Sequence, residues 1–230
     1  MYIRPAAKAF ALTLSLIFSA GFAGATTYNF DGVTANSATN VATGQSQLLL
    51  DVTDSGSGTV AFRFSNTGPL ASSITDVYWD DQSGALGAMG PISVSAGVAF
   101  SQGANPGNLP GGSTIGFSVS PTGASADSNS GRPGVMANGV NPGEWLTIIW
   151  TLVAGVSFND VIAALDLGGD QSGSLRVGIH VQGFSNGGSE SFVNTTPAPV
   201  PVPAAGLLLA GAIGALALSR RRYRTRSRRI

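Results

Sequence analysis

The chain contains no cysteine among its 230 residues. Disulfide bonds, thiol catalysis and cysteine-based metal sites are therefore excluded. The stability of a protein of this size without a disulfide depends on side-chain packing, to which a bound cation could add.

Basic residues are scarce between positions 26 and 196, where only Arg63, Arg132 and Arg176 occur. All 12 acidic residues of the chain lie in this segment, which gives it a net charge of −9. They are Asp31, Asp51, Asp54, Asp76, Asp80, Asp81, Asp127, Glu144, Asp160, Asp166, Asp170 and Glu190. Such a surface repels nucleic acid and anionic polymers and attracts divalent cations. We therefore expect no nucleic-acid partner.

The N-terminal residues 1–25 have the three parts of a secretory signal peptide. Arg4 and Lys8 form a basic start, residues 10–18 (FALTLSLIF) form an apolar core, and Ala23-Gly24-Ala25 supplies a small-x-small site. We expect cleavage before Thr26. The alternative is an uncleaved signal anchor, against which the apolar core is short.

The C-terminal residues 197–230 begin with a proline-rich stretch and continue as an uncharged apolar run, residues 204–219 (AAGLLLAGAIGALALS). An arginine cluster follows, made up of Arg220, Arg221, Arg222, Arg224, Arg226, Arg228 and Arg229. Lipid accepts an uncharged helix, and arginines beside it stay on the cytoplasmic side, so the residues upstream are expected outside the cytoplasm. Sixteen helical residues span about 24 Å, short of the roughly 30 Å hydrocarbon core, which suits temporary holding. The alternative is a plain C-terminal membrane tail.

These features together resemble the PEP-CTERM class of bacterial sorting tails, and most closely its VPLPA-CTERM variant. The matching residues are Val200, Pro201, Val202, Pro203 and Ala204, with Val202 where the family has leucine and with no Pro-Glu-Pro motif. The resemblance covers residues 197–230 only. It implies processing near these five residues by an exosortase, a membrane-embedded cysteine peptidase. It also implies export, with a transient stay in the inner membrane before delivery to the cell envelope or the extracellular space.

Residues 26–196 are enough for one domain with its own core and show the pattern of an all-β protein. Short runs that alternate apolar and polar residues, bounded by Gly, Asn, Asp, Ser and Pro, predict about eight to ten strands in a β-sandwich or jelly roll. The clearest runs are 58–64, 74–79, 92–94, 114–119, 145–153 and 175–181. In the last run, Leu175, Val177, Ile179 and Val181 are expected to point inward and Arg176, Gly178 and His180 outward.

One short helix is expected over residues 159–165 (NDVIAAL). Ser157 or Asn159 would cap its start, and Gly168-Gly169 would follow its end. Long polar loops are expected at 101–113 and 121–143, where glycine and proline set the turns.

One motif suggests catalysis but lacks the context that the chemistry needs. Residues 183–187 match the Gly-x-Ser-x-Gly nucleophile elbow, with Ser185 as the nucleophile. That elbow requires a strand-to-helix turn and a histidine later in the chain, whereas the only histidine, His180, precedes Ser185 and no helical pattern follows. We interpret His180 as an outward strand residue and predict that the protein is not an enzyme.

The most acidic segment also carries two aromatic residues. Tyr78, Trp79, Asp80 and Asp81 could form a glycan-binding edge, since aromatic faces stack on sugars and carboxylates bond hydroxyls. The alternative is an ordinary strand end, with Tyr78 or Trp79 in the core and Asp80-Asp81 opening a turn.

Two loops resemble the oxygen-rich segments that bind calcium. They are Asp51 to Gly56 (DVTDSG) and Asp127 to Gly131 (DSNSG), and neither matches an EF-hand. Each also reads as a plain Asx turn, in which the side chain bonds its own backbone. We therefore assign no metal site and no cofactor, and keep Ca²⁺ as a low-ranking alternative.

The sequence as a whole predicts an exported, acidic β-sandwich with a structural or adhesive role at the cell surface or in the extracellular matrix. Its expected partners are the export machinery and an exosortase, the membrane before processing, and then exopolysaccharide or other surface proteins. Two other functions stay open at this point. One is a lectin-like glycan-binding module, and the other is a secreted hydrolase that uses carboxylates alone.

Overall fold

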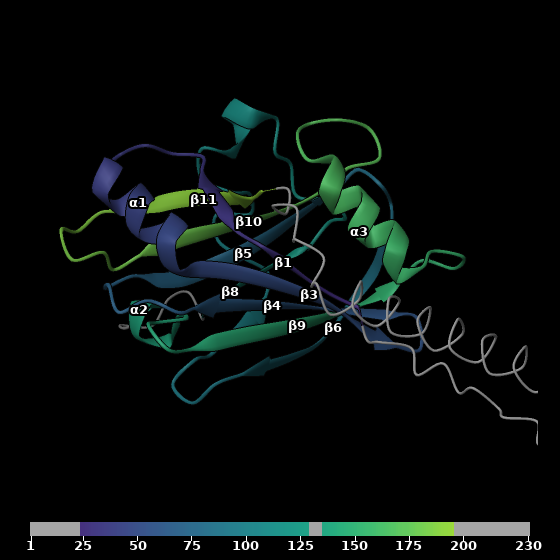
Figure 1. Cartoon of the computed structure of the whole chain (residues 1–230), viewed down its shortest axis with the longest axis horizontal. Helices are drawn as coiled ribbons and strands as arrows, with labels where there is room; N and C mark the ends of the chain where they lie inside the picture. Colours follow the sequence, from purple (N-terminus) through teal and green to yellow (C-terminus); the bar gives the residue numbers. More distant parts are fainter. Residues whose placement is uncertain (1–23, 129–134, 196–230) are drawn as a thin grey trace, which may run out of the picture.

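The structure is a computed structural model that describes residues 24–128 and 135–195. It consists mostly of strands in two antiparallel sheets, with few helices (Figure 1). The all-β prediction is therefore confirmed. Residues 1–23 of the predicted signal peptide (1–25) and the predicted sorting tail at 197–230, including the expected span 204–219, lie outside the described residues. Among the residues that are described, no helix combines the length and apolar character needed to cross a membrane.

The first sheet, sheet A, has five strands. Their spatial order is β1 (Ala25–Tyr28), β3 (Leu48–Gly56), β4 (Thr59–Asn66), β9 (Trp145–Leu152) and β6 (Leu86–Val94). Sheet B has six strands in the order β2 (Phe30–Gly32), β11 (Glu190–Asn194), β10 (Leu175–Gln182), β5 (Ser73–Asp81), β8 (Ser125–Asp127) and β7 (Ser101–Gln102). Four antiparallel pairs are nested along the chain, because β2 pairs with β11, β5 with β10, β6 with β9 and β7 with β8.

Four short helical segments connect the strands of the described chain. They are α1 (Ala38–Gln47), the 3₁₀ helix η1 (Gly112–Ile115), α2 (Val135–Asn138) and α3 (Phe158–Leu167). Helix α3 is the helix predicted at 159–165, and Ser157 is its cap: the Ser157 hydroxyl accepts from the Asp160 backbone N–H while the Asp160 side chain accepts from the Ser157 N–H. The Ser157 hydroxyl also donates to the Asp160 carboxylate at 2.7 Å, and this bond, with the one from the Ser157 N–H, lowers the pKa of Asp160.

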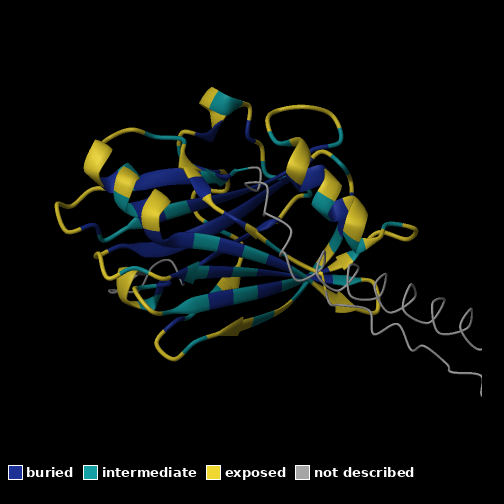
Figure 2. Cartoon of the chain, viewed as in Figure 1, coloured by how far each residue is buried: buried dark blue, intermediate teal, exposed yellow. Residues whose placement is uncertain are grey.

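The two sheets share one core, and its largest side chains are aromatic. Trp79 of sheet B lies edge-on to Phe62, Phe64 and Trp150 of sheet A, with ring centroids 5.7, 5.9 and 5.2 Å from its own. All four side chains are buried. Figure 2 shows the buried residues gathered along the facing strands, with exposed residues concentrated in the loops and helices. Edge-to-face packing of this kind adds to the energy of burial, so this cluster is a principal contact between the sheets.

The alternation predicted for residues 175–181 is confirmed on its inner side and corrected on its outer side. Leu175, Val177, Ile179 and Val181 are fully buried between the sheets. Arg176 and Gly178 do face away from that core, but they are also buried. The reason is that residues 103–120, which we call the covering segment, lie over the outer face of sheet B and contact it through Leu109 and Phe117.

The strand predicted at 114–119 is wrong. The covering segment forms η1 there and then runs to Ser120, which makes an isolated parallel bridge to Asp80. Alternating residues in this stretch reflect a segment that packs Phe117 onto the sheet while its other side faces solvent. Periodicity alone does not distinguish such a segment from a strand.

The aromatic cluster leads to a stability prediction. Trp79→Ala should lower the free energy of unfolding by about 3–5 kcal/mol, because it leaves a large cavity between the sheets. Trp79→Phe is the matched control: it keeps an aromatic ring, and the Nε1–H that it removes has no acceptor among the described residues, so its cost should be clearly smaller. Urea unfolding followed by tryptophan fluorescence measures both, and equal losses for the two variants would contradict this account of the core.

Candidate functional site

The acidic and aromatic segment singled out in the sequence lies on β5, a strand inside sheet B whose nine residues are all buried. Trp79 points into the core between the sheets, whereas Tyr78 and Asp80 point to the outer face under the covering segment. Asp81 lies at the end of the strand. The exposed fractions of Tyr78, Trp79, Asp80 and Asp81 are 0, 0, 1 and 5%. The predicted glycan-binding edge is thus corrected, because these four side chains present no face on which a sugar could stack.

Tyr78 belongs to a small apolar cluster between sheet B and the covering segment. It packs with Leu109 and Phe117, and its hydroxyl donates a hydrogen bond to the Pro106 carbonyl oxygen at 3.1 Å. Burial raises the pKa of Tyr78 far above its ordinary value, and the negative charges of Asp76 and Asp127 raise it further. The phenol therefore stays protonated and serves as a donor that holds the segment in place.

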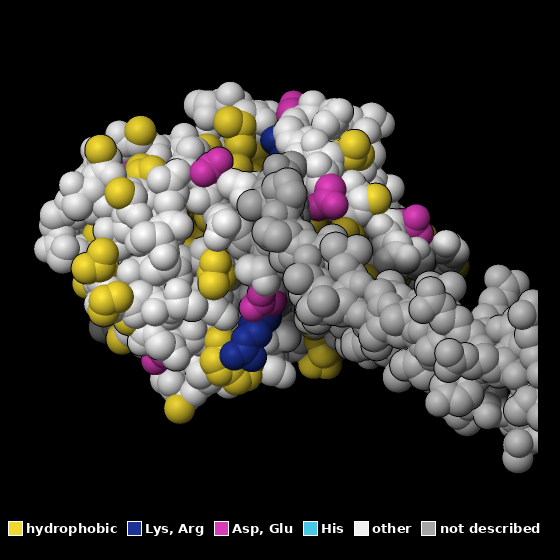
Figure 3. All heavy atoms as spheres, in the orientation of Figure 1, with side chains coloured by type: hydrophobic (Ala, Val, Ile, Leu, Met, Phe, Trp, Pro, Cys, Tyr) yellow, Lys and Arg dark blue, Asp and Glu magenta, His cyan; other side chains and the backbone are white. Residues whose placement is uncertain are grey.

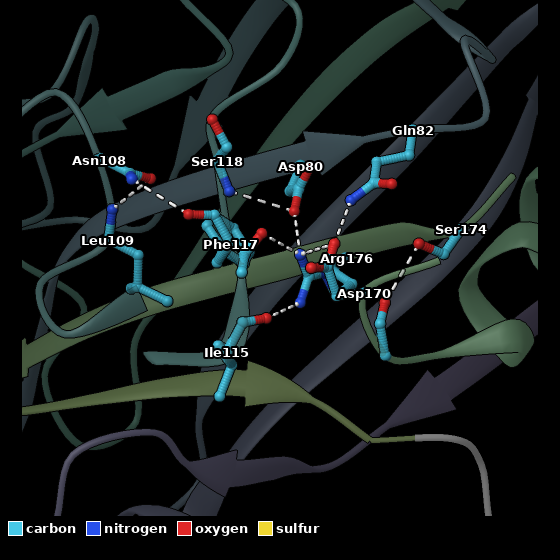
Figure 4. Close-up of polar contacts among 12 residues, drawn as sticks. Asp80, Gln82, Asn108, Leu109, Ile115, Phe117, Ser118, Asp170, Ser174 and Arg176 are labelled. Atoms are coloured by element: carbon cyan, nitrogen blue, oxygen red, sulfur yellow. Dashed lines mark hydrogen bonds and ion pairs between the residues drawn. The ribbon is translucent and has the colours of Figure 1, made fainter. Parts of the chain in front are cut away.

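A buried ion pair lies beside this cluster (Figure 4). The Arg176 guanidinium bonds the Asp80 carboxylate, and the side chains are 3% and 2% exposed. Arg176 also donates to the carbonyl oxygens of Ile115 and Gly116 at 2.7 and 2.8 Å. The backbone N–H of Ser118 donates to the same Asp80 oxygen at 3.2 Å. The pair therefore fastens the covering segment to β5 and β10.

The close approach of the covering segment also explains why β10 has glycine at position 178. A Cβ atom there would lie 2.9 Å from Leu109 Cδ2 and 3.1 Å from Phe117 Cζ, closer than side chains normally pack. Only glycine leaves room for these two side chains at this position.

A second row of polar side chains crosses the outer face of sheet B. The strand register places Asp76 opposite both Asp127 and His180, and His180 Nδ1 lies 3.5 Å from Asp76 Oδ2. Thr75 donates to the same Asp76 oxygen at 2.8 Å. His180 thus lies on the outer face, as its strand position predicts. Across residues 24–128 and 135–195, no group of three or more His, Asp and Glu side chains has a metal-binding arrangement.

The Gly-x-Ser-x-Gly match lies in a turn after β10. The Gly187 N–H donates to the Phe184 carbonyl oxygen, and the chain continues to β11 without a helix. Ser185 is exposed, and no hydrogen bond joins it to His180 within the described chain. A nucleophile elbow needs a strand-to-helix turn and a paired base, neither of which this turn provides.

The two calcium-like loops differ in how much of them is described. In the first, Asp54 accepts from the Gly56 N–H at 2.8 Å, which is the Asx turn weighed from the sequence, and Asp51 accepts from the Thr27 hydroxyl. The second begins in β8 with Asp127, which is buried, and its residues 129–131 lie outside the described chain.

Other acidic side chains bind backbone N–H groups at turns and helix starts. Glu190 of β11 accepts from the N–H groups of Asn36 and Ser37 at the start of α1. Asp81 accepts from the N–H groups of Ser83 and Leu86 in the turn after β5. The roles of Glu190 and Arg176 are not visible in the sequence, because the fold alone brings their partners to them. The turn at Asp81 is the alternative that the sequence offered for this segment.

One hollow of about 580 Å³ lies where α2 meets the start of β5. Pro69, Ala71, Met136, Pro142 and Gly183 contribute to its mainly apolar lining, and none of the described residues around it is ionisable. It therefore offers no group for acid–base chemistry.

Comparison with protein-family models, with curated proteins and with solved structures gave no match to this chain. Of the processing residues predicted from the sequence, Ala23, the motif at 200–204 and the arginines at 220–222 lie outside the described residues. Ala25 is described, and it begins β1 opposite Thr53.

The buried ion pair leads to the second prediction. Asp80→Asn and Arg176→Met should each destabilise the fold by about 3–5 kcal/mol, because each leaves one buried charge without its partner. Asp170→Asn is the matched control: Asp170 lies 3.4 Å from Arg176 but is 51% exposed, so its loss should cost less than about 1 kcal/mol. Urea unfolding gives the three values. A cost for Asp80→Asn as small as that for Asp170→Asn would contradict the anchoring role of the pair.

Proposed function

We propose that this chain is an exported cell-surface or extracellular-matrix protein with a structural or adhesive role. A signal peptide at 1–25 directs export, and the tail at 197–230 holds the chain in the inner membrane through a helix at 204–219. An exosortase then processes the tail near Val200 to Ala204. The observation that carries this proposal is the order of the tail: proline motif, apolar run and arginine cluster at the end of an acidic, cysteine-free domain.

The order of strand pairing supports a jelly-roll-like arrangement of the exported domain. The pairs β2–β11, β5–β10, β6–β9 and β7–β8 are nested one inside the other, as in a long hairpin folded over onto itself. The hairpin of β3 and β4, with β1 beside it, adds to sheet A.

The place where the chain leaves the domain also supports surface display. The Thr195 N–H donates to the Asn29 carbonyl oxygen, and Asn194 pairs with Phe30, so the tail begins beside the first strands. The turn at 183–189 lies at the other end of β10 and β11, because these strands are antiparallel. A domain held by its tail thus presents that opposite end to its surroundings.

The hydrogen bonds and ion pairs that the charged side chains make within the domain favour a structural role over a catalytic one. Asp80 and Arg176 fasten the covering segment, Glu190 binds the N–H groups of the two residues before α1, and Asp160 completes the capping box of α3. A hydrolase that uses carboxylates alone needs two of them facing each other across an open groove. The carboxylates of Asp76 and Asp80 are instead buried on the covered face of sheet B, which weighs against the hydrolase alternative.

The sorting proposal predicts a defined product in the native host. The protein recovered from the envelope or medium should end within residues 200–204, and the full-length form should accumulate in the inner membrane when the exosortase is deleted. Intact mass and the C-terminal peptide measure both. A chain that still ends at Ile230 in the wild-type host would contradict the proposal.

A pair of variants tests whether the motif itself is read. Pro201→Ala with Pro203→Ala should leave the tail uncut, since it removes the prolines of the matched motif. Pro197→Ala with Pro199→Ala is the control: it makes the same chemical change upstream, and processing should continue as in the wild type. Equal processing of both double variants would show that these prolines are not the signal.

A further inference from the structure

The outer face of sheet A differs from that of sheet B in being open. One row of outward side chains crosses all five strands, since the register aligns β1, β3, β4, β9 and β6. The residues of this row are Thr27, Asp51, Arg63, Thr147 and Ser93, and each is at least partly exposed. At the usual spacing between strands, the row is about 19 Å long. It is long enough to contact several units of an extended polymer.

Arg63 is the cation of this row. Its guanidinium is positioned by an aromatic ring and not by an ion pair with a carboxylate. It lies over the ring of Trp145, 4.2 Å from the ring centroid, on the neighbouring strand. Among the described residues it makes no hydrogen bond and no ion pair, even though Asp51 is its neighbour in the row. Stacking therefore fixes the direction of the side chain while leaving its N–H donors for a ligand.

The rest of the row complements Arg63. Asp51 is an acceptor beside it and is itself bonded by the Thr27 hydroxyl at 2.5 Å. Thr147 and Ser93 add hydroxyls on the other side of Arg63, and Trp145 and Ile149 supply partly exposed apolar surface. Figure 3 shows a basic side chain on the visible face of the domain, with an acidic and several hydrophobic side chains beside it. Donors, acceptors and an aromatic ring on one surface match the alternating hydroxyl and C–H groups of a sugar chain.

From this arrangement we infer that the outer face of sheet A binds a neutral polysaccharide, with Arg63, Asp51 and Trp145 as its main contacts. An anionic polymer fits less well, because the charges of Arg63 and Asp51 balance and the segment 26–196 carries a net charge of −9. A protein partner fits less well too, because the large apolar side chains beside the row, Trp145 and Ile149, are only partly exposed. The inference deepens the adhesive role proposed above and rests on it for its setting.

Binding is measured with the full-length chain, purified in a detergent that has no sugar head group, on beads carrying dextran, hydroxyethylcellulose or galactomannan. Depletion of the protein from solution gives the affinity for each polymer. The wild-type chain should bind at least one of the three, with little dependence on salt. Binding to none of them, or salt-sensitive binding only to beads carrying polygalacturonate, would overturn the inference.

Variants locate the surface. Arg63→Ala should weaken binding by about tenfold or more, since hydrogen bonds to a charged group contribute that much. Trp145→Ala should also weaken binding, since it removes the ring that holds the Arg63 guanidinium in place. Arg63→Lys keeps the charge and loses the planar fork, so it should bind less tightly than the wild type.

Asp51→Asn and Asp31→Asn form a matched pair. Both acids lie on strands and accept one side-chain hydrogen bond, from Thr27 and from Gln45, but Asp31 is on the edge strand β2 of sheet B. Asp51→Asn should weaken binding several-fold, whereas Asp31→Asn should leave it unchanged. Unchanged binding in folded Arg63→Ala and Asp51→Asn, checked by near-ultraviolet circular dichroism, would overturn the inference.

This outcome is separate from that of the sorting proposal. The binding assay uses the purified chain and does not involve tail processing, and the mass measurement in the host does not involve glycan binding. A chain that is sorted but binds no neutral polysaccharide would refute only the inference about sheet A.

Discussion

A buried arginine fastens the covering segment to sheet B because it meets two kinds of partner at once. Arg176 neutralises Asp80 on the neighbouring strand and donates to two backbone carbonyl oxygens of the segment. Burying this charge would be costly without both sets of contacts. With them, the segment closes over Tyr78. Gly178 of β10 leaves room for Leu109 and Phe117 of the segment. The ion pair, the Tyr78 hydrogen bond and the packing of Leu109 and Phe117 together turn this sheet surface into a second, smaller core.

The two sheets consequently have outer faces of different character. On sheet B the outward side chains of β5 are buried and bonded, so their chemistry is used within the fold. On sheet A, successive residues of β4 and β9 mostly alternate between buried and partly exposed. This is the pattern of a sheet with one face to water. Contacts with other molecules are therefore expected from sheet A and from the loops. The difference between the two outer faces matters most for Tyr78 and Asp80 of β5, which would be exposed on an open face and are buried here.

The sequence predicted those parts of the fold that local pattern controls. Alternation located β4, β5, β9 and β10, and a serine followed by an apolar run located α3, whose cap and helix are encoded within a few residues. Helix α1 was not predicted, because residues 38–47 contain no charge and little amphipathic pattern. Ser37 caps it locally, but the N–H groups of Asn36 and Ser37 that precede its first turn bind Glu190 from about 150 residues away. The role of Arg176 was missed because its partners in the covering segment are also distant in the sequence. Alternation showed that it faces away from the main core, but only the fold brings residues 115 and 116 above it.

The absence of cysteine gives these polar contacts their importance. A domain without disulfides must hold its long connections by other means, and here buried carboxylates and an arginine bind backbone groups of the connecting segments. Side chains used in this way are fixed and largely desolvated, which makes them poor candidates for binding a ligand as well. The stacked Arg63 on sheet A is different, because its position is fixed by Trp145 while its hydrogen-bonding groups face outward. Rigid placement combined with free donors favours recognition of a ligand, and of the two described arginines, Arg63 and Arg176, Arg63 is the one that combines them.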